Sequence, residues 1–317
     1  MRNLFFILFL SLAFFSCKTE EREVVDVSHI NVDFSLERFD VEFYTSTKEN
    51  LTGLKKKYPL FFPIQTADST WISKIKEEQE LFVETQKLYS DISFLKSELE
   101  QLFKRFKYYN PSFTSPKVIT LLNSVDYENR VIYTGELLLI SLDVYLGANH
   151  HFYADYPSYI KQNFTRDHII VDVANAIITK SKSLVANRSF VSKMVEQGKL
   201  LYLLDTYLPY VEDYQKIGYS EVKYQWAIEN EEQIWKYFIE NKLLFSTDTK
   251  LNQRFLDLAP FSKFYRSEDN QSPGRIGAWI GWQIVKAFME NNNVPLQKLM
   301  HTSSEDIYKQ SKYKPNR

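Results

Sequence analysis

Three polar residues in the second half of the chain have the types and spacing of metal ligands. His168 and Asp172 are four residues apart, so a helix would present both on one face. Glu196 lies in the next segment with helical periodicity, shortly before Gly198. Zinc peptidases of the HExxH type use two histidines on one helix and a glutamate on a later helix. The spacing therefore indicates a His–Asp–Glu metal site as one interpretation.

Two positions lack what a hydrolytic zinc site needs. Ile169 stands where the HExxH pattern has its general-base glutamate, and Asp172 replaces the second histidine. Without a base to take its proton, metal-bound water is not converted into a nucleophile. We therefore expect degenerate metal-site positions at His168, Asp172 and Glu196, with no catalytic residue, no bound metal and no cofactor.

A second interpretation treats the same residues as part of a polar helix face. His168, Asp172, Asn175 and Thr179 follow at steps of four, three and four residues. Such a stripe on an otherwise apolar helix either faces solvent or lines a cleft. Both interpretations are open from the sequence.

The adjacent His150 and His151 are weaker candidates for metal ligands. Neighbouring residues of a strand point to opposite faces, so only a loop would let both side chains reach one ion. A cysteine nucleophile is excluded if the only thiol, that of Cys17, carries a lipid.

The segment from Pro273 to Val285 holds three of the eight glycines in the chain. Gly274, Gly277 and Gly281 are three and four residues apart, which on a helix makes a smooth face for another backbone. An interior glycine costs a helix up to about 1 kcal/mol, so close packing must offset it. A phosphate-binding loop is not indicated, because the spacing differs from G-x-G-x-x-G and no strand precedes it.

The N-terminus has the pattern of a bacterial lipoprotein signal. The apolar run 4–15 would rise only about 18 Å as a helix, well short of the roughly 30 Å hydrocarbon core of a membrane. Ser16 places a small residue directly before Cys17, the arrangement at which lipoprotein processing adds acyl chains. We expect a signal peptide over residues 1–16, palmitate-type lipidation at Cys17 and a tether over residues 17–30. The alternative is a plain signal peptide with an incidental cysteine.

Composition limits the remaining function classes. The net charge of −1 offers no basic excess, so nucleic acid is not an expected partner. With one cysteine the chain cannot form an internal disulfide, and its stability depends on its core, for which 44% hydrophobic residues provide the material.

Patterning predicts one predominantly helical α+β domain over residues 31–317. The expected strands are 117–123, 130–133 and 137–142, which form one small sheet at about 117–143. A helical pattern covers about 70–108, with Ser69 or Thr70 as its cap. Further helices are expected at 165–181, 189–205, 220–241 and 276–291, and from about 303 onward.

The whole chain resembles the gliding motility lipoprotein GldB family of Bacteroidetes. The resemblance is carried by the lipoprotein start and by four segments: Glu37–Asp40, Leu142–Tyr153, Asp172–Ile177 and Gly274–Val285. It implies a cell-envelope lipoprotein that is needed for gliding and linked to type IX secretion. It also implies a distant relation to zinc-dependent peptidases, and hence a zincin-like domain in which His168, Asp172 and Glu196 stand at the ligand positions.

These observations lead to three hypotheses. The first is a non-catalytic pseudo-peptidase, anchored through lipid on Cys17 and acting through other envelope proteins of gliding and secretion. Lys18 and the acidic run after it favour the outer membrane. The second is a metalloenzyme with atypical ligands. The third is a binding lipoprotein that holds a sugar or peptide between aromatic side chains.

Overall fold

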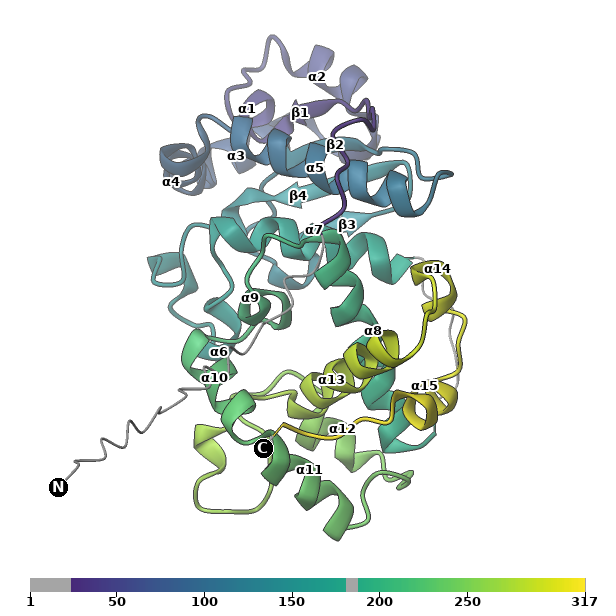
Figure 1. Cartoon of the computed structure of the whole chain (residues 1–317). Helices are drawn as coiled ribbons and strands as arrows, with labels where there is room; N and C mark the ends of the chain where they lie inside the picture. The colour runs from purple at the N-terminus through teal and green to yellow at the C-terminus, as the bar shows by residue number, and fades with distance from the viewer. Residues whose placement is uncertain (1–23, 181–187, 317) are drawn as a thin grey trace, which may run out of the picture.

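The computed structural model describes residues 24–180 and 188–316 (Figure 1). The expected signal peptide, residues 1–16, and the lipidation residue Cys17 lie outside the described residues. The fold is predominantly helical with one small sheet, as the sequence pattern predicts.

Residues 36–109 form a short strand and five helices. These are β1 (Leu36–Arg38), α1 (Phe39–Tyr44), α2 (Leu51–Lys57), α3 (Asp68–Glu77), α4 (Gln79–Tyr89) and α5 (Ser93–Tyr109). The expected continuous helical pattern over 70–108 is therefore three helices. Asp91 helps to make the second break, because its carboxylate accepts hydrogen bonds from the backbone N–H and hydroxyl of Ser93, at 2.8 and 2.9 Å. The expected Ser69 or Thr70 cap is wrong, since α3 begins at Asp68 with no side-chain cap.

The sheet has four strands in the order β1-β2-β4-β3. The three expected strands are confirmed as β2 (Lys117–Leu121), β3 (Val131–Tyr133) and β4 (Leu137–Ser141). β1, β2 and β4 are parallel, and β3 pairs antiparallel with β4 at one edge. The sequence did not predict β1, whose three residues are too few for an alternating pattern to be recognised.

The second half of the chain is helical. Its elements are α6 (Ser158–Lys161), α7 (Ile169–Lys180), α8 (Phe190–Tyr207), α9 (Asp213–Ile217), α10 (Glu221–Glu229), α11 (Glu231–Glu240), α12 (Lys250–Phe255), α13 (Ile276–Asn291), α14 (Leu296–Leu299) and α15 (Ser304–Ser311). Short 3-10 turns occur along the whole described chain, at η1 (Pro59–Phe61), η2 (Tyr127–Asn129), η3 (Leu142–Val144), η4 (His151–Tyr153), η5 (Arg166–His168) and η6 (Asp269–Gln271). The helix expected at 276–291 is confirmed. The one expected at 220–241 is wrong as a single helix, because it ends and restarts at Asn230, whose side chain donates to the Trp226 carbonyl at 2.8 Å.

Two glycines bring α8 and α13 together at backbone distance, low in the view of Figure 1. A Cβ on Gly281 would lie 1.8 Å from the Met194 carbonyl oxygen, and one on Gly198 would lie 2.2 Å from the Gly281 carbonyl. Only glycine permits this approach. Gly277 lies on the same helix, whereas Gly274 precedes it and packs on Ala259, so Gly274 is not part of a helix face.

The described end of the expected tether lies on the folded body. Val27 is buried, and the Val25 carbonyl accepts a hydrogen bond from Arg105 of α5 at 3.1 Å. Within residues 24–180 and 188–316, no helix combines the length and apolar character that crossing a bilayer requires.

Candidate functional site

The structure buries two of the three expected metal-site residues beside each other. His168 ends the 3-10 turn η5 and Asp172 lies in the first turn of α7, and both side chains are buried. The Nε2 atom of His168 lies 3.7 Å from Oδ1 of Asp172. Thr179, at the far end of the same stripe, is exposed. The stripe therefore faces the interior at its start and solvent at its end.

Asp172 is held by a guanidinium and a phenol. Nε and Nη2 of Arg130 each donate to a different carboxylate oxygen at 2.6 Å, and the Tyr145 hydroxyl donates at 2.8 Å. This is the two-pronged arrangement that makes an arginine–carboxylate pair strong and directional. Arg130 directly precedes β3, and its third nitrogen donates to the Tyr127 carbonyl at 2.8 Å. The side chains thus join the sheet edge to α7.

The electrostatics of this cluster favour a charged aspartate and a neutral histidine. Burial alone would raise the pKa of Asp172, but the charge of Arg130 and the hydrogen bonds from Arg130 and Tyr145 hold that pKa below its usual range. Burial lowers the pKa of His168, and Arg130 adds to this effect although Asp172 opposes it. At neutral pH the imidazole is therefore uncharged, and Asp172 and Arg130 neutralise each other.

Glu196 belongs to a different cluster. Its carboxylate pairs with Lys199 of the same helix at 2.7 Å and accepts a hydrogen bond from the Ser304 hydroxyl. Lys199 also donates to the Thr302 carbonyl at 2.8 Å. Glu196 therefore fastens α8 to the start of α15, and among the residues that the structure describes no hydrogen bond or ion pair joins it to His168 or Asp172.

These residues do not fit the zinc ion that the resemblance implies. Zinc requires ligand lone pairs that converge on one point, and a cation already occupies the carboxylate of both Asp172 and Glu196. Across residues 24–180 and 188–316, no group of three or more His, Cys, Asp or Glu side chains is arranged to hold a metal ion.

The neighbouring histidines do not converge either. His150 and His151 lie at η4 with their rings stacked at 4.4 Å, and each faces a different glutamate of α4, Glu84 at 3.6 Å and Glu80 at 3.5 Å. The Nδ1 atom of His150 also accepts from the Phe152 backbone N–H at 3.4 Å. The two histidines therefore have a structural role, because they anchor the η4 turn to α4.

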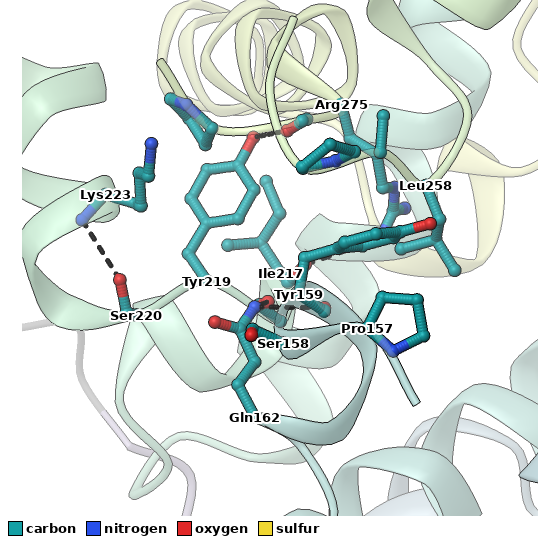
Figure 2. A pocket seen from close by; sticks show the side chains of 15 residues that line it. Pro157, Ser158, Tyr159, Gln162, Ile217, Tyr219, Ser220, Lys223, Leu258 and Arg275 are labelled. Atoms are coloured by element: carbon teal, nitrogen blue, oxygen red, sulfur yellow. Dashed lines mark hydrogen bonds between the residues drawn. The ribbon is translucent and has the colours of Figure 1, made fainter. Parts of the chain in front are cut away.

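A second region, which we call the Arg275 pocket, opens where the glycine-rich segment approaches α6 and the start of α10 (Figure 2). It has a volume of about 460 Å³, within the range of small-molecule sites. Figure 2 shows Arg275, Leu258 and Tyr159 on one side and Lys223 and Ser220 on the other. The sequence did not lead us to predict a role for Arg275. Its position as a single charged residue between Gly274 and an apolar helical segment could have indicated one.

Arg275 adopts an unusual backbone conformation. Its φ of 58° lies in the left-handed region, which is uncommon for residues other than glycine. The segment is fixed there because Ser262 donates to the Pro273 carbonyl at 2.7 Å and accepts from the Ile276 N–H at 3.2 Å. Tyr219 adds a bond to the Gly274 carbonyl at 2.7 Å. The surrounding structure therefore determines where the arginine stands.

Comparison with known proteins identifies one family. The family model described as gliding motility protein GldB matches residues 20–315, nearly the whole chain. No curated protein and no solved structure matches the chain. The two segments that carry most of the resemblance lie in the regions described above, Leu142–Tyr153 with Tyr145 and Gly274–Val285 beside the pocket. The chain belongs to the GldB family of gliding motility proteins.

Proposed function

We propose that this chain is a non-catalytic lipoprotein of the cell envelope that serves gliding motility and type IX secretion through contacts with other proteins. The observation that carries the proposal is the two-pronged ion pair between Arg130 and Asp172. A guanidinium is permanently charged and cannot ionise a water molecule as a metal does. The family's role in gliding supplies the process in which the protein takes part.

The arrangement of helices supports descent from a zincin-like peptidase. His168 and Asp172 stand at the start of α7, and Glu196 lies on the next long helix, α8, in the order that HExxH enzymes use. Arg130 then supplies the positive charge that balances Asp172. A buried carboxylate without its cation would be costly, so the pair allows the fold to persist without chemistry.

The anchor follows from the sequence of the first residues. Lipid on Cys17 would hold the domain at the membrane, and the acidic run after Lys18 favours the outer membrane. Other envelope proteins of the gliding and secretion machinery are the proposed partners, and nucleic acid is not among them.

Gliding by cells that carry single-copy variants tests the proposal. His168→Gln and Glu196→Gln keep hydrogen-bonding groups of similar size but remove metal ligands. We expect each variant that accumulates to wild-type protein levels to support normal gliding and secretion. Cys17→Ser serves as the comparison, because it removes the proposed anchor and should abolish gliding.

Two results would contradict the proposal. One is a loss of gliding in a stably folded His168→Gln or Glu196→Gln variant. The other is peptide cleavage by the purified full chain that EDTA abolishes, which would support the metalloenzyme hypothesis instead.

A further inference from the structure

The Arg275 pocket contains positive charge that the protein itself does not neutralise. The Arg275 guanidinium makes one hydrogen bond, a long one of 3.4 Å from Nη1 to the Ile217 carbonyl. Among the described residues no carboxylate lies within ion-pair distance of it, and the exposed Asp257 acts only at longer range. Burial lowers the pKa of Arg275, although Tyr219 and Asp257 oppose this effect. Burying an unpaired charge is costly, so a compensating ligand is expected.

A second cation stands across the pocket. Lys223 donates to the backbone carbonyls of Asn270 and Ser272 at 2.6 and 2.8 Å, and no carboxylate in the described part of the chain pairs with it. An ammonium group has three donors, and these two bonds leave one. Burial lowers the pKa of Lys223 as well. The two cations give the pocket a positive potential.

The wall beside Arg275 is largely apolar, whereas Ser158, Gln162 and Ser220 line other parts of the pocket. Tyr159, Leu258 and Pro157 lie on the side of Arg275 (Figure 2). Gly274 permits the close fit of the wall, since a Cβ there would lie 2.1 Å from the Ala259 carbonyl oxygen. The left-handed backbone at Arg275 is uncommon for a residue with a side chain, and the surrounding hydrogen bonds maintain it. A positive charge beside an aromatic and aliphatic wall suits a ligand that has an anionic group at one end and an apolar group at the other.

We propose that the Arg275 pocket binds a carboxylate attached to an apolar or aromatic body, with the carboxylate on Arg275 and the body against Tyr159 and Leu258. Arginine suits a carboxylate because its planar donors match the two oxygens. The ligand is either a small organic acid or the C-terminal end of a protein chain, which offer the same chemistry. This inference does not depend on the function proposed above, and either can fail without the other.

Calorimetric titration of the full chain, purified in detergent, tests the pocket with matched ligands. N-acetyl-L-phenylalanine should bind with a dissociation constant of about 1 mM or below. Its amide has the same shape without the charge, and acetate has the charge without the ring. Each should bind at least about tenfold more weakly. A tetrapeptide ending in phenylalanine separates the sources: tighter binding than the single residue indicates a chain terminus, and weaker binding a small acid.

Substitutions locate the binding in the pocket. Arg275→Gln should weaken the binding of N-acetyl-L-phenylalanine at least about tenfold. Lys56→Gln removes the same charge from an exposed residue of α2 and should leave the affinity unchanged. The ligand comparison on the unaltered protein stands even if a variant fails to fold. Equal binding of the acid and its amide, equal binding of acetate, or no binding up to about 10 mM would overturn the proposal.

Discussion

The cluster around Asp172 and the Arg275 pocket use the same chemical group in opposite ways. In the first, Arg130 gives two of its donors to Asp172 and a third to the Tyr127 carbonyl. In the second, Arg275 makes a single long hydrogen bond and has no carboxylate partner in the described part of the chain. One arginine is part of the structure, and the other is available to a ligand.

This difference shows how a candidate site can be recognised when the carboxylates at the expected metal site are already paired. The sequence pattern directs attention to His168, Asp172 and Glu196, but both carboxylates already have cations. An unpaired charge is a better guide to function here. It costs folding free energy, so we expect it to be retained where it contributes to binding.

The largest effect is expected where α8 and α13 meet. α8 carries Glu196 and α13 follows Arg275, and the two helices touch at Gly281. Gly281→Ala should lower the free energy of unfolding by about 4 kcal/mol, because the new methyl group would collide with the Met194 carbonyl. Urea denaturation measures this. Gly53→Ala is the matched control: its Cβ would meet nothing within 4 Å, and it should stabilise by up to about 1 kcal/mol. Equal effects at both glycines would refute the close contact.

Removing the aspartate should expose the structural role of its pair. Asp172→Asn leaves the charge of Arg130 without its counter-ion and should lower the free energy of unfolding by about 3 kcal/mol at neutral pH. The double variant Arg130→Met, Asp172→Leu removes both charges and should recover most of that loss, since paired removal is far less costly than breaking a pair. A double variant less stable than Asp172→Asn would show that the pair acts in some other way.

A third buried carboxylate sharpens the contrast, because it has hydrogen bonds but no cation. Asp143 accepts from the backbone N–H groups of Val125 at 2.8 Å and Asn123 at 3.2 Å, and burial raises its pKa to about 6. The folded state therefore binds this proton more tightly than the unfolded state, whose pKa is near 3.8. The free energy of unfolding should fall by about 3 kcal/mol in total as the pH rises from about 4 to 6, and then level off.

Comparison with Asp143→Asn isolates that contribution. The unfolding free energy of the unaltered protein minus that of the variant should decrease between pH 4 and pH 7, because only the unaltered protein must ionise the buried group. Urea denaturation at several pH values gives this difference. A difference that increases with pH would mean that the carboxylate is stabilised as an anion, as Asp172 is.

The smallest effect is expected at the unpaired arginine. Arg275→Gln breaks no ion pair among the described residues and should change the free energy of unfolding by less than about 1 kcal/mol. Arg130→Gln, which leaves Asp172 without its cation, should cost about 3 kcal/mol. Thermal unfolding of the two variants side by side measures the contrast. A similar loss in both would remove the distinction between the two regions.

The sequence predicted most of the elements because their signals are local. The strands near 117–141 and the helix at 276–291 follow from periodicity. The sequence did not predict the breaks near Asp91 and at Asn230, because each depends on the hydrogen bonds of a single side chain. The sequence could not reveal that Asp172 pairs with Arg130, 42 residues away, because that contact exists only after β3 and α7 pack together. Arg275 escaped because its lack of a partner is visible only in three dimensions.

Zinc titration of the full chain tests the central claim, that the acidic side chains at the expected metal site are committed to internal cations. The comparison is between the unaltered protein and the His168→Gln, Glu196→Gln double variant. We predict identical zinc stoichiometry and affinity in both, because the carboxylates of Asp172 and Glu196 are already paired with Arg130 and Lys199 and cannot join His168 in holding the metal. A tightly bound zinc ion that is present in the unaltered protein and absent from the double variant would contradict the account.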